Sequence, residues 1–136
     1  MAMTSLVAVG LAVAKSAAFK ELVTYEMRQF LSKEAKEKYP EHIPIILERA
    51  ENCDNVPMIE QKRFLCHGDQ DIRQFLNEVR NRHIHIDRNM ALFLFVSKAN
   101  QNTVVGGQET FGCLYKSYKE DDGMLYLKYA GENTFG

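Results

Sequence analysis

The sequence predicts an α+β fold in which a mixed β-sheet carries helices on its faces. The chain has 136 residues, of which 46% are hydrophobic and 26% charged, and this is ordinary for one globular domain with its own core. Short β-branched or aromatic runs alternate with segments whose apolar residues recur at helical spacing. The most apolar run, at residues 90–96, has polar residues on both sides, as expected of a strand inside a sheet.

The first predicted element of the domain is a helix over residues 19–38. Its apolar residues have helix-compatible spacing, and residues 33–38 are rich in strong helix formers. The residue before a proline is pushed out of the α region, so the helix is expected to end at Tyr39 ahead of Pro40.

Two strands are predicted next, at residues 43–47 and 62–66, and they are expected to form a hairpin. Pro44 should confine the near end of the first strand to an edge or irregular position, because proline donates no ladder hydrogen bond. Asp69 or Asp71 is expected to cap the helix that follows. The apolar face of that helix is expected to consist of Ile72, Phe75, Leu76 and Val79.

The C-terminal half is predicted to add a strand at 90–96 that is central and buried on both faces. Its core positions are expected to be Leu92, Leu94 and Val96, or their neighbours Phe93 and Phe95. A helix near residues 109–118, a turn at 121–123 and a last strand at 125–129 complete it. This order of elements is that of a β-grasp, or ubiquitin-like, roll with additional helix at the N-terminus.

Residues 1–18 are expected to form an apolar arm ahead of the domain at 19–136. The apolar run at 6–14 is too short to span a membrane, which takes about 20 residues. No lysine or arginine precedes it, so the positively charged start of a signal peptide is missing. A cytosolic arm that binds a membrane or a partner is therefore favoured.

The bulk charge and the cysteines exclude several classes of protein. The formal net charge of −1 gives no support to nucleic-acid binding. The odd number of cysteines, three, and their long spacings indicate free thiols in a reducing compartment. Cys66 is expected to be a packing residue, since it sits in an apolar run.

The chain ends in small polar residues, one aromatic residue and a glycine, at 129–136. A terminal glycine has no Cβ, so its carboxylate can enter a narrow site and be activated. The segment is therefore predicted to be a flexible tail that carries a conjugation site. A truncated chain or an ordinary frayed terminus would end in the same way.

Three motifs occur in a specific order: K-Y-P-x-x-I-P-I at 38–45, A-L-F-L-F-V at 91–96 and Y-x-G-E-N-T-F-G at 129–136. Together with shorter matches from Phe19 onward, they resemble the ubiquitin-like modifiers of autophagy, the family of the GABA-receptor-associated protein and the microtubule-associated light chain. The resemblance implies the ubiquitin-like β-grasp fold. The lack of a catalytic signature in the sequence predicts separately that the protein is not an enzyme, and no cofactor is expected.

The resemblance further implies that Gly136 is the conjugation site. An E1-like and an E2-like enzyme would join it to phosphatidylethanolamine, after a cysteine protease that recognises Phe135 has exposed it. The protein would be cytoplasmic, with a lipidated pool on autophagosomal or other vesicle membranes. It would serve there in autophagosome formation and cargo recruitment.

The family also implies a docking surface for short receptor peptides of the form aromatic-x-x-aliphatic, which add a strand to an open sheet edge. The edge is expected at residues 62–66, from Lys62 to Cys66. Carried over by position, the first anchor site comprises Ala35, Pro44, Ile46, Leu65 and Met124, with Arg63 beside it. The second anchor site comprises Phe64, Cys66, Phe75 and Val79. Arg63 and Arg82 could meet acidic residues that flank the peptide.

The chain departs from the family pattern around the second anchor site. His67, Gln70 and Glu78 are polar where the family has apolar residues, and His83 looks like a one-residue insertion. His83 and His85 lack further ligands at usable spacing, so no metal site is expected. No nucleophile–base signature or P-loop occurs. The alternative function is a divergent paralogue, non-conjugated or joined to another protein, that acts as a scaffold at vesicles or microtubules.

Overall fold

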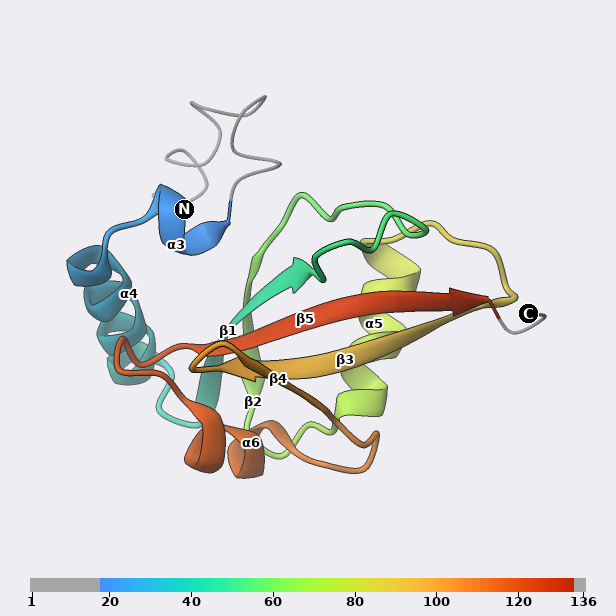
Figure 1. Cartoon of the computed structure of the whole chain (residues 1–136). Helices are drawn as coiled ribbons and strands as arrows, with labels where there is room; N and C mark the ends of the chain where they lie inside the picture. Colours follow the sequence, from blue (N-terminus) through green and yellow to red (C-terminus); the bar gives the residue numbers. More distant parts are fainter. Residues whose placement is uncertain (1–17, 134–136) are drawn as a thin grey trace.

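The computed structural model describes residues 18–133, so residues 1–17 of the arm expected at 1–18 lie outside the described residues. The described part is one mixed sheet with strand order β2-β1-β5-β3-β4 and helices on both faces (Figure 1). β1 runs parallel to β5, and the other neighbouring strands are antiparallel. The predicted α+β class is therefore confirmed. The strands are β1 (His42–Arg49), β2 (Arg63–His67), β3 (Met90–Lys98), β4 (Gln101–Val104) and β5 (Leu125–Asn133).

The predicted helix at 19–38 is two helices, α3 (Phe19–Leu22) and α4 (Tyr25–Lys38). The prediction of one continuous helix is wrong because Val23 and Thr24 are extended between them. Thr24 then acts as the N-cap of α4, and its side-chain oxygen accepts a hydrogen bond from the Met27 N–H at 3.2 Å. The predicted end is confirmed, since Tyr39 is the C-cap of α4.

The predicted hairpin is confirmed, with Ile45 opposite Phe64 and Pro44 opposite Leu65. The parallel pairing of β1 with β5 begins at Ile45. Pro44 therefore lies in the end of β1 that precedes this pairing, as its missing N–H requires. β2 is the outermost strand on this side of the sheet.

Helices α5 (Ile72–Arg82) and α6 (Phe111–Tyr118) cover one face of the sheet. Asp71, one of the two predicted caps, accepts a hydrogen bond from the Gln74 N–H at 2.9 Å. The buried side chains of this core come from both helices and from alternate positions of β1, β3 and β5. They include Ile45, Leu47, Ile72, Phe75, Val79, Leu94, Val96, Phe111, Leu114, Leu125, Leu127 and Tyr129.

The other face of the sheet carries α3 and α4 over a smaller core. This second cluster consists of Phe19, Leu31, Ile46, Met124 and Tyr126. Adjacent strand positions such as Leu125 and Tyr126 therefore face different cores. The N-terminal helices thus occupy the side of the sheet opposite α5 and α6.

β3 differs from the strand predicted at 90–96. It is not central, because β5 lies in the middle of the sheet. It is also not buried on both faces, since Leu94 is 2% exposed and Phe93 37%. Of the two alternative sets predicted to fill this strand, Leu94 and Val96 are buried, whereas Phe93 is partly exposed because α3 and α4 pack over β1 and the start of β5.

Two features of the C-terminal half were not predicted. β4 follows β3 through a tight turn at Ala99 and Asn100, which have φ of 54° and 64°. β5 continues to Asn133, four residues beyond the predicted end. Only residues after Asn133 could form the expected tail, and they lie outside the described residues. Within residues 18–133, no helix combines the length and apolar character needed to cross a bilayer.

Candidate functional site

The candidate site is the open edge formed by β2. Side chains alternate along this strand, so its two sides face different helices. Arg63 and Leu65 pair with Ile46 and Pro44 and lie on the side of α4. Phe64 and Cys66 pair with Ile45 and Ile43 and lie on the side of α5. The residues of the two predicted anchor sites are thereby separated onto opposite sides of the edge.

The first anchor site combines one accessible side chain with buried ones. Leu65 is 38% exposed, whereas Ile46 and Met124 are fully buried in the core under α4. Ala35 is half-buried on α4, and Pro44 is buried opposite Leu65. Leu65 is therefore the accessible apolar side chain of this set, whereas Ile46 and Met124 belong to the buried core on the same side of the sheet.

The second anchor site is filled by aromatic rings. Phe64 lies edge-to-face with Phe75, with ring centroids 5.3 Å apart, and with His83 at 5.1 Å. Phe75 and Val79 are buried in the core between α5 and the sheet. His83, which looks like an insertion relative to the family pattern, thus packs against the ring of Phe64.

Cys66 is a buried free thiol on this side of the edge. Burial is the main cause that raises the pKa of the thiol to about 12, and the nearby carboxylate of Glu78 adds to it. A thiol with so high a pKa is a poor nucleophile at neutral pH. The expected packing role of Cys66 is therefore confirmed.

The predicted cations occupy different surroundings. Lys62 precedes β2, and its Nζ lies 3.2 Å from the Glu48 carboxylate. Burial lowers the pKa of the half-buried Arg63 guanidinium, while the carboxylate of Glu34 acts in the opposite direction. Arg82 is exposed at the C-terminal end of α5. These three side chains lie toward the start of the open edge of β2.

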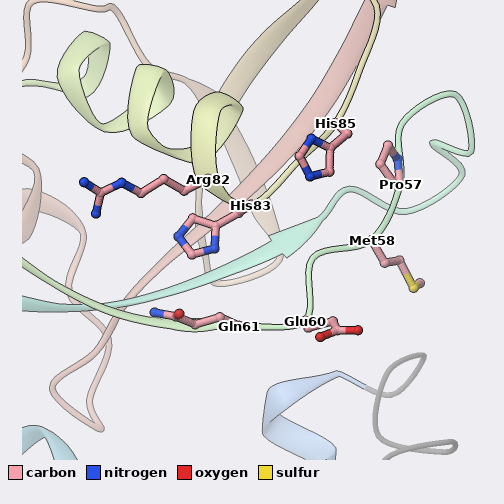
Figure 2. A pocket seen from close by; sticks show the side chains of 7 residues that line it. All are labelled: Pro57, Met58, Glu60, Gln61, Arg82, His83 and His85. Atoms are coloured by element: carbon pink, nitrogen blue, oxygen red, sulfur yellow. The ribbon is translucent and has the colours of Figure 1, made fainter.

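A hollow of about 510 Å³ adjoins the start of β2 (Figure 2). It lies between the connection that leads into β2 and the segment after α5. Its lining residues are Pro57, Met58, Glu60, Gln61, Arg82, His83 and His85. Arg82 is the member of this lining that the resemblance assigned to peptide binding. Within residues 18–133, no group of three or more His, Cys, Asp or Glu side chains is arranged to hold a metal ion.

The far end of β2 carries a cluster that sequence reasoning missed. The His67 ring lies between the carboxylates of Glu41, at 3.6 Å, and Asp69, at 3.8 Å. Its Nδ1 accepts a hydrogen bond from the Asp69 N–H at 3.1 Å, and the His42 ring packs edge-on against it. The hairpin register, which pairs His42 with His67, brings Glu41 and His42 to this end of β2, whereas Asp69 follows His67 by two residues.

The two predicted conjugation residues, Phe135 and Gly136, lie outside the described residues. β5 ends at Asn133, so the strand leads directly into the segment that contains them. Within β5, the buried Tyr129 donates its hydroxyl hydrogen bond to the Pro57 carbonyl at 2.6 Å, which ties this strand to the connection before β2.

Known proteins resemble this chain over most of its length. The family model described as "Autophagy protein Atg8 ubiquitin like" matches residues 27–136. Autophagy-related protein 8c of Arabidopsis thaliana is 40% identical over 121 residues, which cover 89% of this chain and 97% of that protein. Autophagy-related protein 8 of Mycosarcoma maydis is 35% identical over 119 residues, covering 88% and 96%.

A solved structure agrees with the sequence matches. The crystal structure of Trypanosoma brucei ATG8 superposes with a TM-score of 0.75 at 33% identity, covering 90% of this chain and all of the other. The predicted ubiquitin-like β-grasp fold with N-terminal helices is confirmed by this match and by the mixed five-stranded sheet. The family match, the relatives and the fold agree, and the chain belongs to the Atg8 family of ubiquitin-like autophagy proteins.

Proposed function

We propose that this chain is a modifier of autophagy, joined through Gly136 to phosphatidylethanolamine, that docks short peptide segments on the edge of β2. On the membrane it would take part in autophagosome formation and recruit cargo receptors. The chain is the substrate of its conjugation enzymes and supplies no catalyst of its own. Membership of the Atg8 family supports the part of this proposal that assigns the chain to autophagy.

The conjugation begins at the carboxylate of Gly136. Attack of this carboxylate on ATP gives the acyl adenylate and releases pyrophosphate. The thiol of the E1-like enzyme displaces AMP, and the thioester then passes to the E2-like enzyme. The amine of phosphatidylethanolamine attacks the thioester carbonyl, forms an amide and releases the enzyme thiol. A glycine suits these transfers because no side chain crowds the carbonyl.

The geometry of β2 is the observation that carries the docking function. β2 is an outermost strand of the sheet, with Leu65 exposed toward α4 and Phe64 turned toward α5. A segment that adds a strand to β2 obtains main-chain hydrogen bonds whatever its sequence. With two spacer residues between them, the two anchors of the segment point to opposite sides of the added strand. Leu65 and Phe64 likewise lie on opposite sides of β2, so each side can receive one anchor.

The experiment is a reconstituted conjugation with the E1-like and E2-like enzymes of a relative, ATP and vesicles that contain phosphatidylethanolamine. The native chain is expected to become attached to lipid. Deletion of Gly136 should abolish the attachment and leave the fold unchanged. The matched control is Gly106→Ala, because a Cβ at Gly106 meets only ordinary contacts. Lipid attachment of the deletion variant would contradict Gly136 as the site. A native chain that stays unmodified while the relative is conjugated would favour the non-conjugated scaffold.

A further inference from the structure

We propose that the α5 side of the docking edge selects a basic side chain, so that the partner segment combines one apolar anchor with a lysine or arginine. This inference rests on the proposed docking function of β2 and names the chemistry of its partner. It replaces the aliphatic second anchor that the family resemblance implied.

The apolar floor of the second anchor site is already occupied. The rings of Phe111, Phe75, Phe64 and His83 follow one another edge-to-face, with centroids 5.1 to 5.3 Å apart. Phe75 and Val79 have almost no exposed surface. An aliphatic side chain would have to separate these rings to be buried there, because protein interiors are close-packed. The site therefore offers the faces and edges of rings at its surface, and little depth.

Glu78 provides the charge beside this floor. Arg80 and Arg73 lie on the side of α5 that faces away from β2. Arg80 donates a hydrogen bond to the Met90 carbonyl at 2.6 Å, and the Arg73 side chain lies close to Gly107. Glu78 follows Phe75 by three residues, so helical spacing turns it toward β2 with the Phe75 ring. Its carboxylate also acts on the thiol of Cys66, in the middle of the edge.

The Glu78 carboxylate is open to a ligand. Glu78 is exposed, and within residues 18–133 no ion pair or hydrogen bond to its carboxylate is found. The carboxylates of Glu41 and Asp69 flank His67, which alternates onto the α4 side of β2 with Leu65, so Glu78 is the carboxylate that serves the α5 side. Arg82 lies one turn further along α5, at the hollow beside Gln61. On the α5 side, the negative charge of Glu78 thus lies near Cys66, and the positive charge of Arg82 lies toward the start of β2.

A lysine or arginine matches both properties. Its methylene stem can lie across the rings of Phe64 and His83, and its charged head can reach the Glu78 carboxylate. A partner segment that adds a strand to β2 points every second side chain toward the α5 side. One of these side chains would therefore lie beside Glu78. An aliphatic residue at that position would cover the rings but leave the carboxylate desolvated and unpaired.

The test uses calorimetric titration of the full chain with two synthetic peptides. Both carry a tryptophan anchor and two spacers, followed by lysine in one and leucine in the other. The native chain should bind the lysine peptide about tenfold more tightly, a difference typical of one charge-assisted contact. In Glu78→Leu the order should reverse. Glu37→Leu, an equal change on the exposed side of α4, should keep the native order.

The possible results distinguish failure of the proposed selection for a basic residue from failure of the proposed docking on β2. Binding of both peptides with leucine preferred, or with equal affinities, would overturn the basic selection and leave docking on β2 intact. Absence of binding by either peptide would overturn the docking function and this inference together. Thermal unfolding of each variant, at a midpoint close to that of the native chain, shows that an altered order is not a folding defect.

Discussion

Arg28 of α4 forms an ion pair with Asp122 in the turn that precedes β5. The Nε and Oδ2 atoms are 2.9 Å apart, and the side chains are 11% and 2% exposed. The Tyr126 hydroxyl and the Met124 N–H also donate hydrogen bonds to the Asp122 carboxylate. This network fastens α4 to the sheet, and α4 forms one wall of the candidate docking edge. The Arg28–Asp122 pair therefore connects the stability of the fold with the shape of the site.

Asp122→Asn is expected to destabilise the chain by about 3–5 kcal/mol. The change keeps the shape of the side chain but leaves the guanidinium of Arg28 buried without its partner, and a broken buried pair carries a cost of this size. Chemical denaturation measures the loss. The control is Asp121→Asn, an exposed neighbour that should change stability by no more than about 0.5 kcal/mol. Equal effects of the two changes would contradict the assigned role of the pair.

Alternation in β3 gives a second prediction. Leu94→Ala should cost about 3 kcal/mol, because Leu94 is fully buried between the sheet and its helices. Phe93→Ala removes a larger side chain but should cost only about 1 kcal/mol, because that ring is partly exposed. Urea unfolding of the two variants compares them directly. A larger loss of unfolding free energy for Phe93→Ala than for Leu94→Ala would mean that another molecule covers this face of the sheet in solution.

The buried thiol of Cys66 predicts a dependence of stability on pH. Its pKa is raised to about 12 in the folded chain from 9.0, so the folded state keeps a proton that the unfolded state releases. The contribution of the thiol to stability is complete below about pH 9 and is lost as the pH rises toward 12. The free energy of unfolding should therefore fall above pH 9.

Cys66→Ala should remove this part of the decline, by at most about 1.4 kcal/mol for each pH unit. The exposed Cys113 supplies the control, since Cys113→Ala should keep the native slope. Guanidinium denaturation at a series of pH values measures both. A native slope in Cys66→Ala would show that the thiol titrates alike in the folded and unfolded states.

Docking on β2 predicts that Leu65→Asp weakens peptide binding at least about tenfold. The change puts a charge where the apolar anchor of the peptide is received, and that charge would be desolvated. Val104→Asp makes the same change at an exposed apolar residue of β4, on the other edge of the sheet. It should leave affinity unchanged in calorimetric titrations with a tryptophan-anchored peptide. Comparable losses in both variants would mean that β2 is not the docking edge.

The sequence predicted the parts of the fold that depend on local chemistry. Pro40 ends α4 and Asp71 caps α5, because caps and proline act within one turn of the chain. The turn at 121–123 was also predicted, and Gly123 there has φ of +88°. β4 was missed because Ala99 and Asn100 adopt positive φ without the usual asparagine–glycine signal.

Features that depend on distant residues could not be predicted from the sequence. The exposure of Phe93 is decided by where α3 and α4 pack, and no periodicity within β3 reports that. The residues of the candidate edge were named by resemblance, but the packing of His83 against Phe64 follows from the tertiary structure. The cluster around His67 likewise needs the register of the hairpin.

Conjugation to lipid is the central claim, and a mass spectrum of the protein recovered from autophagosomal membranes tests it most directly. The predicted spectrum contains the chain with the mass of one phosphatidylethanolamine added and one water lost, and fragmentation places the adduct on Gly136. A membrane-bound chain of unmodified mass would contradict the claim. So would an isopeptide bond between Gly136 and a lysine of another protein.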